Sequence, residues 1–302
     1  MIFNLGSVNI DYVYAVPHLP QPGETLAAAS MSVGLGGKGA NMSVAIARAG
    51  GPVRHIGAVG PDGVWAKARL AGYGIDVDHV ATVDVATGHA IINVDAQGEN
   101  AIVIFPGANH EQSDRAIAAG LADAGAGDFL IFQNETNGRE FAMTQALERG
   151  LQVIYVPAPY DEDPVKPLLP KADILVLNEV EFGQMIQATG RDVATLGIPT
   201  IVVTRGAQGA VLLEESSGWS ERVFSAPKVA AIDTTGAGDT FAGYLAAGLE
   251  VGLSAEQSVE RAVTAAALKV TRRGTAEAIP SLDEVQTFLG QEPTKGASSP
   301  QS

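Results

Sequence analysis

The sequence contains no cysteine, although it is 302 residues long. Disulfide bonds, thiolate metal ligands and a cysteine nucleophile are therefore excluded. Basic residues are also scarce: 19 lysines and arginines stand against 34 aspartates and glutamates, for a formal net charge of −15 at pH 7. Nucleic acids and anionic membranes bind basic surfaces, so we expect neither as a partner.

Long apolar runs are absent as well. No stretch of the chain reaches a membrane-spanning length, and residues 1–9 lack the basic start of a secretory leader. We therefore expect a cytoplasmic protein. Aromatic residues make up only 6% of the chain, but hydrophobic residues make up 46%, which suffices for a large core.

Short apolar runs alternate with alanine-rich segments of helical periodicity along most of the chain. The expected strands are residues 2–8, 53–59, 129–132, 152–156, 174–177, 200–204 and 210–213. The expected helices are residues 39–49, 63–71, 113–122, 139–149, 179–188, 240–249 and 255–270. This alternation predicts an α/β fold, a doubly wound and mostly parallel sheet flanked by helices.

Two segments break the alternation. Residues 12–35 contain no helical stretch and carry three prolines, whereas residues 87–104 alternate about a turn, which is typical of a hairpin. We interpret segments at about 10–35 and 87–105 as a small antiparallel β lid, with a decorated edge of the main sheet as the alternative. Residues 1–290 are then one domain, and the composition of residues 291–302 predicts a disordered tail.

The sharpest motif is the turn Asp233-Thr-Thr-Gly-Ala-Gly-Asp239, which runs into an expected helix. Its small residues let the backbone N–H groups of Gly236, Ala237 and Gly238 converge at a helix N-terminus, which predicts an anion hole for phosphate. Asp239 is expected at or near the helix cap, as an ionised base for phosphoryl transfer. A purely structural cap is the alternative.

A second glycine-rich segment, residues 34–41, contains Gly37, Lys38 and Asn41. It matches the dinucleotide-binding pattern Gly-x-Gly-x-x-Gly, but it follows a proline-rich segment and no acidic residue closes the next strand. We favour a loop in which Lys38 and Asn41 bond to sugar hydroxyls. Asn9 and Asp11 point the same way in an extended chain and suit vicinal hydroxyls, with local turn formation as the alternative.

Polar residues also follow two of the later strands. Asn178 and Glu181 share a face at a helix start, where they could organise Mg²⁺ and its waters; a capping box is the alternative. Thr204, Gly206 and Gly209 link the next two strands, where they could hold a nucleotide or form only a tight turn.

With these motifs in this order, the chain resembles the ribokinase-like, or PfkB, carbohydrate kinases along most of its length. Gly-Gly-Lys-Gly-Ala-Asn at 36–41 and Asp-Thr-Thr-Gly-Ala-Gly-Asp at 233–239 are the two signatures of that family. Segments 6–11, 22–25, 98–100, 106–109 and 270–274 are most similar to its ribokinase group. The resemblance implies a kinase that uses ATP and Mg²⁺ to phosphorylate a sugar, D-ribose first among them.

Carried over by position, the resemblance implies a role for each matched residue. Asp239 would be the catalytic base, beside the anion hole of Gly236, Ala237 and Gly238. The sugar would be bound by Asn9, Asp11, Gly37, Lys38, Asn41 and Glu135, with Ala90 and Ile102 closing over it from the lid. ATP would contact Asn178, Thr204, Gly206 and Gly209, and Glu181 would act on Mg²⁺ indirectly. The lid would also form a homodimer contact.

The resemblance allows a monovalent cation such as K⁺ beside the anion hole. Its ligands would be Asp233 and the carbonyl groups of Thr235, Lys269, Arg272 and Gly274. The chain departs from the family here, because Ala278 stands where a serine hydroxyl is usual and Lys269 adds a positive charge. His89 is a second departure, in a lid position that is usually apolar; it could reach the sugar or line the dimer contact.

Several alternatives stay open. The substrate could be fructose, a 2-keto-3-deoxy-sugar acid or a nucleoside, although a polar sugar cage leaves little provision for a base. Outside this activity, a non-catalytic sugar-binding regulator and a nicotinamide-dependent oxidoreductase are the competing classes. The intact turn at 233–239 argues against the regulator, and an absence of nicotinamide cofactor binding would dismiss the oxidoreductase.

Overall fold

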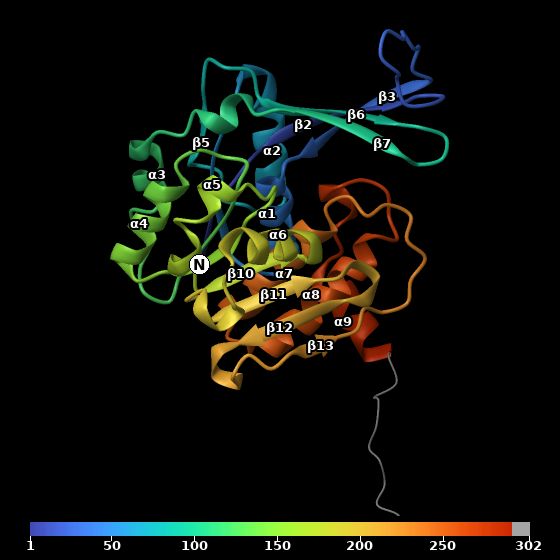
Figure 1. The fold of residues 1–302 in the computed structure, drawn as a ribbon. Helices are drawn as coiled ribbons and strands as arrows, with labels where there is room; N and C mark the ends of the chain where they lie inside the picture. Colours follow the sequence, from blue (N-terminus) through green and yellow to red (C-terminus); the bar gives the residue numbers. More distant parts are fainter. Residues whose placement is uncertain (292–302) are drawn as a thin grey trace, which may run out of the picture.

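Two β-sheets organise the chain, of which a computed structural model describes residues 1–291. A nine-stranded sheet runs through the body, and a four-stranded sheet projects from it as a lid (Figure 1). The tail expected at 291–302 lies outside the described residues from residue 292 on. Gln291 itself is the last residue of helix α9 (Leu282–Gln291), not part of a tail.

The large sheet confirms the doubly wound, mostly parallel architecture. In spatial order its strands are β13 (Arg222–Phe224), β12 (Ala210–Glu214), β11 (Thr200–Thr204), β10 (Ile174–Asn178), β9 (Gln152–Val156), β8 (Phe129–Gln133), β1 (Ile2–Leu5), β4 (Val53–Val59) and β5 (Val80–Thr82). All strands from β11 to β5 run parallel, and only β12 is antiparallel to its neighbours. The carboxyl ends of the parallel strands therefore share one edge of the sheet.

Helices cover both faces of this sheet, so its central strands are buried on both sides. One face packs against α1 (Lys38–Arg48), α2 (Val64–Gly72), α7 (Ala237–Glu250), α8 (Ala255–Lys269) and α9. The other packs against α3 (Asp114–Gly120), α4 (Arg139–Arg149), α5 (Glu162–Val165) and α6 (Glu179–Thr189). Within residues 1–291, none of the helices combines the length and the apolar character needed to cross a bilayer.

The lid is a sheet of its own, which excludes a decorated edge of the main sheet. Its strands lie in the order β3 (Ser30–Gly36), β2 (Asn9–Ala15), β6 (Gly88–Val94) and β7 (Asn100–Phe105). The outer pairs, β2–β3 and β6–β7, are antiparallel as predicted. The inner pair, β2–β6, is parallel, a detail that the sequence pattern did not predict.

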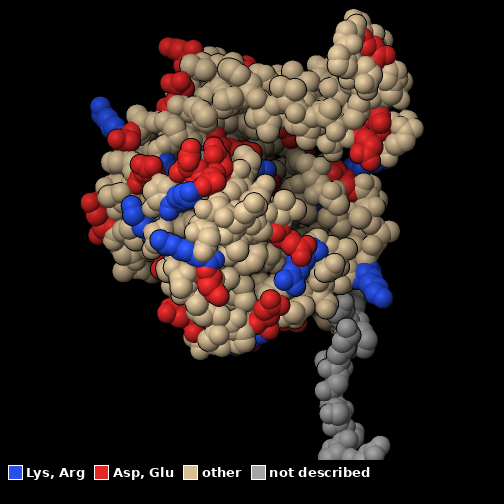
Figure 2. Space-filling model, in the orientation of Figure 1, with Lys and Arg blue, Asp and Glu red and all other residues tan. Residues whose placement is uncertain are grey.

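The two faces of the lid differ because side chains alternate along each strand. One face carries Asn9 and Asp11 and is turned toward the body, where Asn9 bonds to Asn109. The opposite face points away from the body and is apolar. Its exposed side chains include Met31, Val33, Ile91, Val103 and Phe105. The projecting arm accordingly has few charged side chains along its length (Figure 2).

Candidate active site

The two glycine-rich motifs meet at the starts of helices α1 and α7. The side-chain Nδ2 of Asn41 donates to Asp239 Oδ2 at 2.8 Å, although the two residues are 198 positions apart. The helices approach closely at Gly243, where a Cβ atom would lie 2.5 Å from the Cβ of Ala45. The motifs thus form one site rather than two.

Asp239 is buried in this contact, with 8% of its surface exposed. It is the third residue of α7; the N-cap is Gly236, whose φ of 74° is in the left-handed region that favours glycine. Asp239 thus lies near the N-cap, as predicted, but it is not the capping residue itself, so the alternative of a purely structural cap is not supported. Burial raises its pKa, and the nearby Lys38 ammonium and the Asn41 hydrogen bond offset only part of this rise.

The turn before α7 offers backbone N–H groups to an anion. The N–H of Ala237 donates to Thr234 O at 3.2 Å. Among the three predicted anion-hole residues, Ala237 is therefore the one whose N–H already has an acceptor in the protein. Within the described chain, the N–H groups of Gly236, Gly238 and Asp239 have no acceptor. They are free to donate to an anion at the positive end of the helix.

Asn9 and Asp11 extend from β2 into the same site. Asn9 Oδ1 accepts from Asn109 Nδ2 at 2.7 Å, and Asn109 Oδ1 accepts from Val8 N at 2.9 Å, which leaves the Asn9 amide hydrogens for a ligand. No donor in the described residues bonds to the Asp11 carboxylate. Burial, with the nearby carboxylates of Glu135, Glu277 and Asp239, raises the pKa of Asp11 to about 7.

Glu135 joins the first strand to the start of α1. Its Oε2 accepts from Ser7 Oγ at 2.5 Å and from Lys38 N at 3.1 Å, and its Oε1 lies 3.7 Å from Lys38 Nζ. The carboxylates of Asp239 and Glu135 raise the pKa of Lys38 against its burial. Ser7 and Asn109 are positioning residues that the sequence analysis missed, because each was noted only as part of a matching segment.

Gly37 and Gly39 let the chain cross at the base of this site. Gly37 is the N-cap of α1 with φ 92°, and a Cβ on Gly39 would lie 2.3 Å from the Cα of Gly6. A buried polar network holds the crossing: Asn4 Nδ2 donates to Gly39 O and to Ser43 Oγ, both at 2.8 Å. The loop is thereby fixed before any ligand arrives.

The lid residues divide between its two faces. Ala90 is paired in register with Asp11 and is buried, and Ile102 lies on the same face, 47% exposed. His89 lies on the opposite face, with its ring 5.1 Å from that of Phe105 and 6.0 Å from that of Tyr12. The suggestion that His89 reaches the sugar is therefore wrong. Figure 2 shows a hollow between the lid and the body, with acidic side chains on its rim.

The end of β10 faces the same centre. Asn178 pairs with Thr204 in the parallel register, and Asn178 and Glu181 form the reciprocal capping box, with both bonds at 2.9 Å. Burial raises the pKa of Glu181, and the charges of Lys38 and Asp239 also act on it. Because the cap uses only Oε2 of Glu181, its Oε1 stays available to water bound to a cation.

Gly206 and Gly209 form the turn after β11. Arg205 N donates to Gly209 O at 2.7 Å, and both glycines have positive φ, of 52° and 96°. A Cβ on Gly209 would lie 1.9 Å from Phe224 O. The tight-turn interpretation is thus confirmed, and the contact with a nucleotide stays a prediction.

Asp233 ties together the loops expected to hold a monovalent cation. Its Oδ1 accepts from Thr235 N and its Oδ2 from Gly274 N, both at 2.9 Å. Lys269 was expected to contribute its carbonyl, but its ammonium group enters the loop and donates to Asp233 O at 3.1 Å. Among the described residues, no group of three or more histidines, aspartates or glutamates is arranged to hold a metal ion directly.

Residues 1–282 match the family model described as "pfkB family carbohydrate kinase". The ribokinase of Haemophilus influenzae is 36% identical over 299 residues, which cover 94% of this chain and 97% of that protein. The deoxyribokinase of Salmonella typhi is 31% identical, with 94% and 97% covered. The structure of Arabidopsis thaliana ribokinase complexed with ribose and ATP superimposes with a TM-score of 0.84 at 29% identity, covering 95% of this chain and 98% of that one.

Proposed function

Because this chain belongs to the pfkB family of carbohydrate kinases, we propose that its reaction converts D-ribose and ATP to ribose 5-phosphate and ADP. The enzyme class, a phosphotransferase with an alcohol group as acceptor, follows from the family itself. The choice of ribose is supported by the similarity to ribokinases, one of which was solved with ribose and ATP.

The observation that carries the proposal is the buried hydrogen bond between Asn41 and Asp239. It joins the loop suited to sugar hydroxyls with the turn suited to phosphate, so that an acceptor hydroxyl and a phosphoryl group would meet at one carboxylate. The free N–H groups at the start of α7 belong to the same turn as this carboxylate, where they suit a transferred phosphoryl group. Phosphoryl transfer depends chiefly on such positioning and on charge stabilisation.

In this mechanism Asp239 accepts the proton of the O5 hydroxyl as the oxygen attacks the γ-phosphorus. The new O5–P bond forms while the bond to the β–γ bridging oxygen breaks, and ADP leaves with that electron pair. The N–H groups of Gly236, Gly238 and Asp239 stabilise the charge on the transferred group. Burial makes Asp239 a stronger base than an exposed aspartate, which suits proton abstraction near neutral pH.

The ring hydroxyls bind to the groups beneath the lid. Asp11 and Glu135 Oε1 accept from hydroxyls, whereas the Asn9 amide and the Lys38 ammonium donate to them. Gly37 keeps the backbone close to this set. Ala90 and Ile102 cover the sugar from the lid.

The nucleotide side of the site consists of Asn178, Thr204, Gly206 and Gly209, at the carboxyl ends of β10 and β11. The residues present fit a magnesium ion that arrives with ATP, because Glu181 keeps one carboxylate oxygen free toward the centre. Such an ion neutralises charge on the phosphates when bound. Since the reaction needs ATP, we place it in the cytoplasm.

A substrate panel tests the choice of sugar. D-ribose, 2-deoxy-D-ribose, D-fructose, a 2-keto-3-deoxy-sugar acid and a nucleoside are each incubated with ATP and Mg²⁺, and ADP and the phosphorylated product are measured directly. We expect kcat/KM for ribose to exceed that for each of the others by about tenfold or more, since a polar site discriminates against missing hydroxyls. A higher value for any other member would replace ribose by that substrate.

We further propose that the enzyme is a homodimer in which the outward faces of two lids pack together. Large apolar side chains cluster there, among them Val103 at 66% and Met31 at 54% exposed. Contiguous apolar surface of this kind marks a protein interface. His89 then lies at the seam, beside Tyr12 and Phe105.

A further inference from the structure

Lys269 ends helix α8 with its side chain completely buried. Within residues 1–291 it is the only lysine or arginine whose side chain is completely buried. Its Nζ donates to Asp233 O at 3.1 Å and lies 4.0 Å from Asp233 Oδ1. A buried ammonium is unfavourable unless an opposite charge compensates it, so its place beside Asp233 needs a reason.

The Asp233 carboxylate is negatively charged, and its hydrogen bonds connect the anion-hole turn with the segment that follows α8. Thr235 N, on the anion-hole turn, and Gly274 N, after α8, bond to its two oxygens. The backbone N–H groups of Ile232 and Asp233 both donate to Val270 O, at 2.7 and 3.1 Å. A positive charge beside this carboxylate therefore fixes the turn whose N–H groups bind the phosphoryl group.

The surroundings do not fit a second, diffusible cation. Lys269 already binds the Asp233 carbonyl, the Lys269 carbonyl accepts from Arg272 N at 3.0 Å, and Ala278 has no hydroxyl. A cation bound to Asp233 would also meet the ammonium charge at close range. Two of the five expected K⁺ ligands, the Asp233 carboxylate and the Lys269 carbonyl, are thus already engaged by the protein itself.

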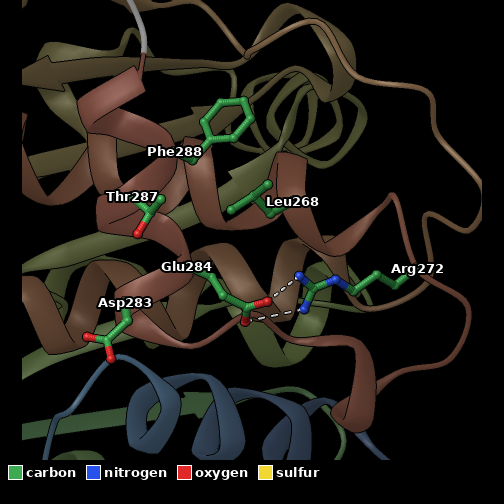
Figure 3. A pocket seen from close by; sticks show the side chains of 6 residues that line it. All are labelled: Leu268, Arg272, Asp283, Glu284, Thr287 and Phe288. Atoms are coloured by element: carbon green, nitrogen blue, oxygen red, sulfur yellow. Dashed lines mark hydrogen bonds and ion pairs between the residues drawn. The ribbon is translucent and has the colours of Figure 1, made fainter.

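Arg272 does not supply the charge instead. Its guanidinium turns toward α9, where its two terminal nitrogens bond to the Glu284 carboxylate at 2.5 and 3.4 Å (Figure 3). This pair borders a cavity of about 350 Å³ lined by Leu268, Asp283, Thr287 and Phe288. Arg272 anchors the loop from its outer side, and Lys269 is the cation on its inner side.

We propose that the Lys269 ammonium is a built-in replacement for the activating monovalent cation. It holds Asp233, and through Asp233 the anion-hole turn, so that the kinase works at full rate without K⁺. Lys269 is a positioning residue, because it acts on the phosphoryl group through the turn. The inference rests on the proposed kinase activity but not on the identity of the sugar.

The first test uses the unmodified enzyme. Its rate is measured with whichever sugar of the panel is turned over, in KCl and in choline chloride of equal ionic strength, from ADP formed and without coupling enzymes that need cations themselves. We expect the two rates to agree within about twofold, because a side chain of the protein itself supplies the cation. A stimulation by K⁺ beyond that overturns the proposal, whereas failure of ribose in the panel bears only on the substrate.

The second test removes the charge with Lys269→Ala and Lys269→Met. In choline chloride we expect kcat to fall by about tenfold or more, as when one electrostatic support of a transition state is lost. K⁺ or NH₄⁺ should restore much of the rate of Lys269→Ala, whose shortened side chain leaves room for an ion. KCl should also raise the melting temperature of this variant but not that of the unmodified protein.

Lys67→Met is the matched control, because Lys67 Nζ also donates to a backbone carbonyl, that of Val80, but outside the site. It should show no new cation dependence. Full activity of Lys269→Met in choline chloride would overturn the proposal. A Lys269→Ala protein that is folded, slow and indifferent to K⁺ and NH₄⁺ would also do so, since it would show a purely structural role.

Discussion

Asp239 and Asp11 are two buried carboxylates whose properties come from their surroundings. Both lie near the Lys38 ammonium, yet burial raises the pKa of each. Asp239 has a hydrogen bond from Asn41, whereas no donor among the described residues bonds to Asp11. A sugar hydroxyl would supply the donor that Asp11 lacks, so substrate and protein complete one network.

Replacing Asp239 by asparagine tests its role as the base. Asp239→Asn keeps the shape of the side chain but cannot accept the proton, so kcat should fall by roughly 10²–10⁴ with little change in sugar KM. The melting temperature should change little, or rise, because the variant buries no charge. Asp114→Asn makes the same change in the first turn of α3, on the surface, and should leave kcat unaltered. Near-normal kcat in Asp239→Asn would contradict the assignment.

The pKa of Asp11 predicts a pH dependence of sugar binding. Ionised Asp11 accepts from hydroxyls, so kcat/KM for the sugar should fall as the pH decreases through about 7. Asp239 also titrates above its usual range, and the comparison with Asp11→Asn isolates the part due to Asp11. This variant should lose about 10²-fold in kcat/KM and show a shallower decline between pH 8 and 6. An unchanged profile in the variant would refute the role of Asp11.

The same group affects stability with a definite sign. A folded-state pKa raised from 3.8 to about 7 means that the fold holds the proton more tightly than the unfolded chain. The free energy of unfolding therefore falls as the pH rises between those two values and is constant above them. Asp11→Asn should be more stable than the unmodified protein at pH 8, by on the order of a few kcal/mol, and equally stable at pH 4. Urea unfolding at both pH values measures this.

Residue roles were predictable only where a motif marks them. The base, the turn and the sugar loop were predicted from the glycine-rich motifs and the family resemblance, and their roles stay predictions. The contact between Asn41 and Asp239 bridges 198 positions and depends on how α1 packs on α7. The pKa of Asp239 depends on burial, which sequence spacing does not encode. Lys269 was expected to act through its backbone carbonyl as a cation ligand. Helical periodicity does not predict whether the side chain of a lysine at a helix end points inward.

At the scale of elements, the strands buried on both faces were the best predicted. Strands β4, β9 and β11 and helix α4 match the expected ranges at both ends. The first strand was predicted to reach residue 8, but β1 ends at Leu5 because Gly6 crosses Gly39 there. The short edge strands β5 and β13 were not predicted, since three residues carry too little pattern.

The close approach of Gly6, just after β1, to Gly39 in α1 predicts that neither position tolerates a larger side chain. Gly39→Ala would place a methyl group 2.3 Å from the Gly6 Cα, so we expect a loss of ~2–4 kcal/mol in the free energy of unfolding and a displaced sugar loop. Gly183→Ala is the control, because Gly183 lies within α6 and a methyl group added there would have no heavy atom within 4 Å. That change should stabilise the protein by about 0.5–1 kcal/mol. Equal effects of the two substitutions would contradict the close approach.

At the scale of the whole molecule, a strongly acidic body carries a lid whose outward face is apolar. The net charge of −15 keeps molecules apart in general, whereas the lid offers a surface without that repulsion. The acidic composition argues against partners that need basic surfaces, which stays a prediction, and it gave no indication of where the apolar side chains would gather. That depended on the pairing register of β2, β6 and β7.

A charge on the outward face of the lid should separate the proposed dimer. Val103→Glu places a carboxylate at a residue that is 66% exposed, and its burial against a second lid would be unfavourable by several kcal/mol. Sedimentation velocity should then show a monomer where the unmodified protein is a dimer. Val180→Glu, on α6 at 69% exposure, is the control and should leave the mass unchanged. A monomeric unmodified protein would refute the interface.

Strand β2 contributes side chains alternately to the two faces of the lid. Asn9 and Asp11 lie on the inner face, while Tyr12 lies on the outer face beside His89, whose ring in turn lies near Phe105. We expect sugar binding and the proposed subunit association to be linked through this strand, and any effect of one on the other is reciprocal and of the same factor. A sugar affinity that changes on dilution of the enzyme would show such coupling, carried across a single layer of backbone.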